Sequence, residues 1–128
     1  MASIGELKTF TLQAAADLRT HQYKIMRTVN AGTCNVASLA TAYSMIGVLT
    51  NKPNSGQAAA IAYLGECKIM APGVVAANIP VTTDGSGQLT AAASGDMIIG
   101  RTLEASANAG ELIRCLINPP MRHFGAVS

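Results

Sequence analysis

Aromatic and charged residues are scarce in this chain. Of its 128 residues, 4% are aromatic, none is Trp, and 12% are charged, against roughly 25% in typical soluble domains. The nine basic residues are scattered along the chain, so the basic stripe and the stacking platforms of nucleic-acid-binding proteins are missing. A domain with so little charge presents much uncharged surface, which is typical of proteins that bind other proteins. We therefore expect protein partners and no nucleic acid.

Cysteine and histidine are too few and too dispersed for the common metal and disulfide frameworks. The three cysteines, Cys34, Cys67 and Cys115, form no close pair in the sequence, and their odd number does not suit a secreted disulfide framework. We interpret them as apolar thiols of a reducing compartment. The two histidines, His21 and His123, lie in no familiar nucleophile arrangement. We expect no metal and no cofactor.

The carboxylates also lack a pattern that indicates acid–base chemistry. Asp84 and Asp96 fall in glycine-rich stretches, where Asp commonly bonds the local backbone, and Glu104 and Glu111 flank another turn. The run from Asp84 to Gly87 lacks the Lys and the following helix of a phosphate-binding loop, and it has too few oxygen ligands for calcium. A tight hairpin turn explains it. The sequence therefore predicts a protein that is not an enzyme and has no small-molecule substrate.

Long apolar runs are absent from the sequence. The least polar stretch, from Met70 to Pro80, is broken by Pro72 and Gly73, so it cannot span a membrane as a helix. The first six residues contain no basic region followed by an apolar segment, so no signal peptide is visible. We expect a product that stays in the cytoplasm in which it is made and has no membrane partner.

Short β-like runs separated by Gly, Asn, Asp, Pro and Ser make up most of the chain. Only residues 12–18 have helix-forming composition, enough for one or two turns. The long helices of parallel βαβ units are missing. We expect an all-β fold, a small β-barrel or β-sandwich of short antiparallel strands with at most one short helix. The predicted strands cover residues 8–12, 23–29, 33–37, 44–50, 58–63, 66–70, 79–83, 88–91, 97–103 and 111–117.

The length of the chain suits one domain, residues 1–128. We divide it into an N-terminal arm of residues 1–7, a β core of residues 8–117 and a C-terminal tail of residues 118–128.

An internal pseudo-twofold repeat is visible within the predicted core. Gly47 and Gly100 each lie inside a predicted strand, and Gly56 and Gly110 each lie in the following turn, at offsets of 53 and 54 residues. Two such units could close one barrel together and leave no open edge. For the two mid-strand glycines we expect β-bulges that curve the sheet, with a ligand close to the backbone as the alternative.

Several segments of the chain, taken in order, resemble the small capsid cement or decoration proteins of tailed bacteriophages, the group labelled DUF2190-like. The likeness covers residues 8–117. The departures are Arg101–Ala105, where the family reads Ala-Leu-Glu-Ala, and the C-terminal extension from Pro119. The segments that carry the resemblance are residues 9–12, 14–18, 22–23, 46–53, 56–59, 81–88, 94–96, 99–100, 103–105 and 109–113.

The resemblance implies a virion structural protein on the capsid exterior. Such proteins bind where subunits of the major capsid protein meet, and many are homotrimers, in which avidity strengthens modest contacts. We expect the two arms to make the contacts with the capsid or with other protomers, because extended arms can add strands to foreign sheet edges. The candidate contact residues are Ile4, Leu7, Phe10, Met121, Arg122, His123 and Phe124.

Other interpretations stay open at this point. A different virion or β adaptor module, such as the base of a head fibre, would bind something other than an assembled shell. An isolated β-barrel hydrolase or lyase fragment would need a pocket of polar side chains with shifted pKa values. Nucleic-acid binding through a barrel face would weaken steeply with added salt.

Overall fold

The computed structural model describes residues 7–30, 32–38, 44–93 and 95–122, and the strands there form one nine-stranded sheet. The all-β prediction is confirmed. In the described part of the chain, no helix is long and apolar enough to cross a membrane. The strands are β1 (Lys8–Ala14), β2 (Ile25–Thr28), β3 (Thr33–Val36), β4 (Met45–Leu49), β5 (Ala58–Met70), β6 (Pro80–Thr83), β7 (Leu89–Ala91), β8 (Met97–Thr102) and β9 (Leu112–Arg122).

Three boundaries differ from the sequence prediction. The helical turns expected at residues 12–18 are wrong, because the chain there continues β1 to Ala14 and then bends. The two strands expected on either side of Leu64 and Gly65 are a single strand, β5, in which Gly65 has a φ of 116°. At the other end of the core, β9 continues past Ile117 as far as Arg122.

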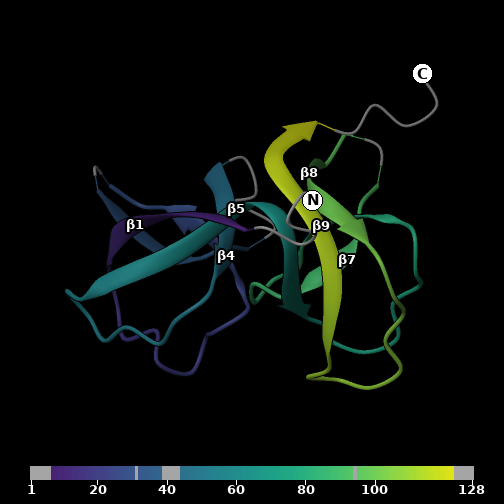
Figure 1. Ribbon diagram of the computed structural model, residues 1–128, viewed down its shortest axis with the longest axis horizontal. Coiled ribbons are helices and arrows are strands. Elements are labelled where there is room, and N and C mark those ends of the chain that lie inside the picture. Colours follow the sequence, from purple (N-terminus) through teal and green to yellow (C-terminus); the bar gives the residue numbers. More distant parts are fainter. Residues whose placement is uncertain (1–6, 31, 39–43, 94, 123–128) are drawn as a thin grey trace, which may run out of the picture.

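The sheet consists of two consecutive copies of one five-stranded unit. The first repeat, residues 8–64, has the strand order β3-β2-β4-β5, and the second repeat, residues 65–122, has the equivalent order β7-β6-β8-β9. The first half of β5 is the last strand of the first repeat. The second half of β5 is the first strand of the second repeat and is equivalent to β1. Figure 1 shows β5 passing from the first repeat on the left to the second on the right.

Backbone hydrogen bonds outside the strand ladders repeat in the same way. The Tyr23 N–H donates to the Leu49 carbonyl (2.7 Å), as the Asn78 N–H does to the Thr102 carbonyl (2.9 Å). Tyr23 and Asn78 are also the two described non-glycine residues with positive φ, at 70° and 62°. Three further hydrogen bonds, each from a backbone N–H to a carbonyl, have an equivalent in the second repeat. They are Ala14 to Gln57 (equivalent Ala71 to Glu111), Gly56 to Ala14 (Gly110 to Ala71) and Ala37 to Ile25 (Ala92 to Pro80). The predicted internal repeat is therefore real at the level of the backbone.

The mid-strand glycines are required by strand contact as well as by bulges. A Cβ on Gly47 would lie 2.1 Å from the Ala62 carbonyl oxygen, and one on Gly100 would lie 2.3 Å from the Leu116 carbonyl oxygen. The register also shifts beside both glycines, in the pairing of β4 with β2 and of β8 with β9, as expected for bulges. Each repeat thus uses a glycine to bring two strands unusually close.

The two repeats do not share one barrel, which corrects the expected closure. In the first repeat, β1 pairs in parallel with β3 and antiparallel with β5, and these five strands form a closed barrel. In the second repeat, the strands equivalent to β1 and β3 are the second half of β5 and the whole of β7. Within the described residues, these two strands are not paired directly. Instead the Met70 N–H donates to the Tyr23 carbonyl (2.9 Å), and the Ile25 N–H donates to the Gly87 carbonyl (2.7 Å). A segment of the first repeat thus fills the gap in the second.

The two faces of the first repeat explain the two hydrophobic cores. Met26, Leu49 and Ile61 point into the first barrel and form the smaller core. Their strand neighbours Ile25 and Val48 point outward and join the larger core, which is otherwise built mainly from the second repeat. Strand residues alternate between faces, so the first repeat is apolar on both sides of its sheet. The second repeat is packed against the outside of the first.

Candidate docking surface

The second repeat leaves one face of its sheet exposed. Along β5 and β9, Cys67, Ile69 and Cys115 are buried, whereas the alternate residues point away from the core. Leu116 is 54% exposed although it lies in the middle of the sheet, between β5 and β8. We call this surface the outer face. It comprises Leu64, Glu66, Lys68, Pro80, Ile98, Arg101, Arg114 and Leu116.

A shallow groove of about 420 Å³ runs across the outer face. Its floor and walls are largely apolar, with Leu64 from β5, Leu116 from β9 and Ile98 from β8. Arg101 and Asn118 supply most of the polar side chains. Leu64 is 38% exposed, so two large apolar side chains here are open to solvent. Exposed apolar side chains with a polar rim are typical of protein interaction sites.

A cluster of charges lies at one end of the outer face. The Arg114 guanidinium is 3.1 Å from a Glu66 carboxylate oxygen and 3.5 Å from one of Glu104. The hydrogen bond to Glu66 and the two negative charges raise the pKa of Arg114. Because these side chains are substantially exposed, the ion pairs contribute little to folding stability. No ion pair with a described residue engages Lys68, which lies directly opposite Arg114.

The structure separates the contact residues predicted from the sequence. Leu7 is half-buried and packs against the larger core, whereas Phe10 is 37% exposed and contacts the Tyr63 ring edge to face, with ring centroids 5.5 Å apart. Met121 and Arg122 lie in β9, opposite Ile98 and Met97 of β8. The remaining candidates lie outside the described residues: Ile4, His123 and Phe124.

Both ends of the described chain reach the groove. Leu64 and Ile98 line the groove. The register partner of Leu64 is Lys8, and that of Ile98 is Met121. The sequence prediction placed the contacts on the arms and did not include the sheet face between them, and the contact residues stay a prediction. Alternation in β9 is the signal that could have found it, because Leu116 shares its side with Arg114 rather than with the apolar Cys115.

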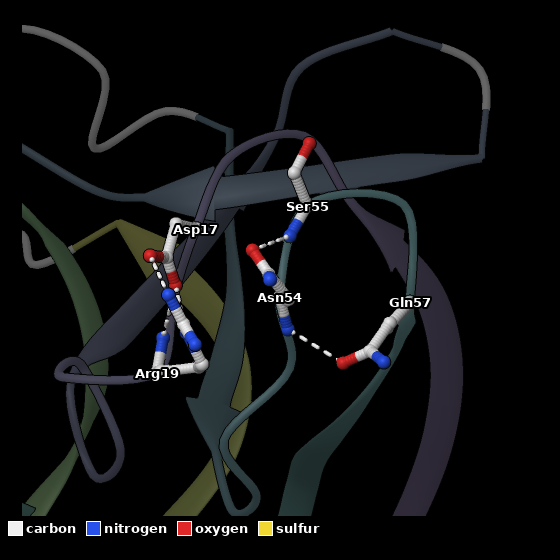
Figure 2. Close-up of polar contacts among 5 residues, drawn as sticks. All are labelled: Asp17, Arg19, Asn54, Ser55 and Gln57. Atoms are coloured by element: carbon white, nitrogen blue, oxygen red, sulfur yellow. Dashed lines mark hydrogen bonds and ion pairs between the residues drawn. The ribbon is translucent and has the colours of Figure 1, made fainter.

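The turns before β5 and β9 are built alike, because Gln57 in one and Glu111 in the other each accept a hydrogen bond from the backbone N–H three residues earlier. Neither turn is part of the outer face. Figure 2 shows the turn before β5, where the Gln57 side chain accepts a hydrogen bond from the Asn54 N–H at 2.8 Å. Asp17 and Arg19 form an ion pair at 2.8 Å, and the bond from Arg19 lowers the pKa of Asp17 to about 2. These contacts are local and exposed, so we assign them to turn geometry.

No group of three or more His, Cys, Asp or Glu in the described ranges is placed to hold a metal ion. Cys67 and Cys115 are register partners on β5 and β9, and burial raises the pKa values of their thiols to about 11 and about 12. Thiols with such pKa values are poor nucleophiles near neutral pH. Both thiols lie on the buried side of the sheet and are not part of the outer face.

Comparison with known proteins gives a fold but no family. No family model matches the chain, so the resemblance to the DUF2190-like group is not confirmed. No curated protein matches it either. Among solved structures, the chain is similar to the N base of head fibre gp8.5 in bacteriophage phi29, with a TM-score of 0.67 and 16% identity. The alignment covers 92% of this chain and 100% of that one, so the two share a fold over most of this chain and all of that one.

Proposed function

We propose that this protein is a non-catalytic structural component of a phage virion that binds the outer surface of the capsid. The observation that carries the proposal is the fold shared with a head fibre base over 92% of the chain. The low charge density and the exposed apolar groove support it, because the cores of protein interfaces are depleted in charge.

In the first form of the proposal, the protein cements neighbouring subunits of the major capsid protein. It would act as a homo-oligomer, with a trimer favoured by the sequence resemblance. Several weak contacts made together hold a shell more firmly than any one of them. This form predicts that the bound protein raises the temperature at which filled heads release their DNA.

The second form is an adaptor on the head, equivalent in place to a fibre base. The solved neighbour favours this form directly, since its own description is a head fibre base. An adaptor binds the shell and holds another component, and it need not stabilise the shell. The two forms share the docking step and differ in its consequence.

The test is co-sedimentation of the purified protein with expanded capsids that lack it, beside unexpanded procapsids. Saturable binding to expanded capsids supports the proposal, and a rise in the DNA-release temperature of filled heads then selects the cement form. Saturable binding without that rise selects the adaptor form. No binding of well-folded protein to either shell would overturn both.

A further inference from the structure

One cross-strand row of the outer face corresponds to a row that the fold buries in the first repeat. The cross-strand row Ile25–Val48–Ala62 has the same register as the row Pro80–Arg101–Leu116. The first row is fully buried under the second repeat, whereas Leu116 in the second row is 54% exposed and Arg101 is exposed. In the described part of the chain, no other segment covers the second row.

The differences between the two rows indicate what kind of partner the outer face takes. Pro80 replaces Ile25, whose N–H bonds the other repeat, so the same backbone contact cannot form again. Arg101 replaces the buried Val48, while Leu116 is larger and more apolar than Ala62. The outer face therefore cannot receive a further copy of the repeat in the same way. It keeps an apolar centre but adds a positive charge beside it.

Basic side chains outnumber acidic ones on this surface. Among the side chains that the structure describes, four basic and two acidic ones lie on or beside the outer face. Both of these acidic residues are engaged by Arg114. The described side chains thus give this surface a local excess of two positive charges. The six residues are Lys8, Lys68, Arg101, Arg114, Glu66 and Glu104.

We propose that the outer face is the surface that docks on the capsid, and that it takes an apolar patch of the shell protein flanked by carboxylates. This inference rests on the proposed function. A second copy of this chain, which carries the same net positive charge, is a poorer electrostatic match. Leu116 and Leu64 supply the apolar centre, and Lys68, Arg101 and Lys8 attract the carboxylates around it.

The test measures affinity for expanded capsids with two pairs of matched variants. Leu116→Asp places a carboxylate in the groove, and Val74→Asp makes the same kind of change at an 83% exposed site outside it. Lys68→Glu and Lys52→Glu alter the net charge equally, on the outer face and in a loop of the first repeat. All four positions are exposed, and matching thermal unfolding curves would establish that each variant is folded.

We expect Leu116→Asp to weaken binding roughly 30-fold or more, as for an interface hot spot, and Val74→Asp to bind like the parent. Lys68→Glu should weaken binding several-fold at low salt and reduce its salt dependence, whereas Lys52→Glu should do neither. Equal binding by Leu116→Asp and Val74→Asp would overturn the inference and leave the proposed function intact. Failure of the parent itself to bind would remove both.

Sedimentation velocity of the free protein completes the test. If Leu116→Asp dissociates an oligomer of the parent without changing the shell affinity per protomer, the outer face belongs to a second copy, and the inference is wrong. If the oligomeric state of the variant matches that of the parent while the shell affinity falls, the assignment to the capsid stands.

Discussion

Adding a single methyl group at Gly47 or Gly100 should destabilise the fold far more than the usual Gly-to-Ala change. A Cβ on Gly47 would lie 2.1 Å from the Ala62 carbonyl oxygen and 2.8 Å from Cγ2 of Ile61. Ordinary contact begins near 3.4 Å, so β4 and β5 would have to separate by roughly 1 Å. The atom in the way is backbone, which cannot change rotamer. We therefore expect a cost at the upper end of overpacking effects, about 3 kcal/mol or more.

This cost is large enough to measure by thermal unfolding. For a chain of this size it corresponds to a fall in Tm of roughly 10 °C. The matched control is Gly73→Ala, because a Cβ there has nothing within 4 Å and the backbone needs no positive φ. That control should stay within about 0.5 kcal/mol of the parent, or gain slightly from reduced unfolded-state entropy. If Gly47→Ala and Gly73→Ala melted at the same temperature, the close strand contact would be refuted.

Three further predictions follow from the buried groups and the seam between the repeats. The folded-state pKa values of Cys67 and Cys115 are raised from 9.0 to about 11 and about 12. The free energy of unfolding should therefore be full below pH 9 and fall as the pH rises above it. Urea titrations at pH 8 and 10.5 should show a smaller loss of this free energy for Cys67→Ala than for the parent. Hydrogen bonds from backbone N–H groups lower the pKa of Glu111, so its contribution to folding stability should be present above pH 4.5 and disappear as the pH falls through the lowered pKa. Glu111→Gln should flatten that part of the pH–stability curve, and an unchanged slope would contradict the assignment. Ile25→Pro removes the N–H that bonds Gly87 and should cost about 2–4 kcal/mol in chemical denaturation, so a variant as stable as the parent would show that this seam is not needed.

The strand positions were largely predictable from the sequence, and the exceptions have a physical cause. Gly65 was interpreted as a break between two strands, but β5 passes through it with a φ of 116° that glycine adopts freely. Residues 12–18 are rich in alanine, which favours a helix locally. Pairing of β1 with both β3 and β5 outweighs that preference, because it satisfies the backbone and buries Ala14.

The candidate docking surface was less predictable than the fold. The glycine spacing predicts two repeats, and alternation in β9 marks the side that carries Leu116. Neither pattern tells that the equivalent side of the first repeat is covered. That information comes from the insertion of residues 23–25 into the second repeat, through hydrogen bonds between residues 47 and 62 positions apart. Without knowledge of this insertion, Leu116 is simply one apolar residue of a strand. Its equivalence to the buried Ala62 then does not indicate a surface for binding.

The same insertion sets an order in which the chain can fold. All hydrogen-bonded strands of the first barrel lie within residues 8–64, so that barrel can close as soon as those residues are available. The second repeat cannot satisfy Met70 and Gly87 until the segment from Tyr23 to Ile25 is in place. During synthesis from the N-terminus, the first repeat therefore acts as a template for the second. A permuted chain that began with the second repeat would have to fold without its template and should refold more slowly.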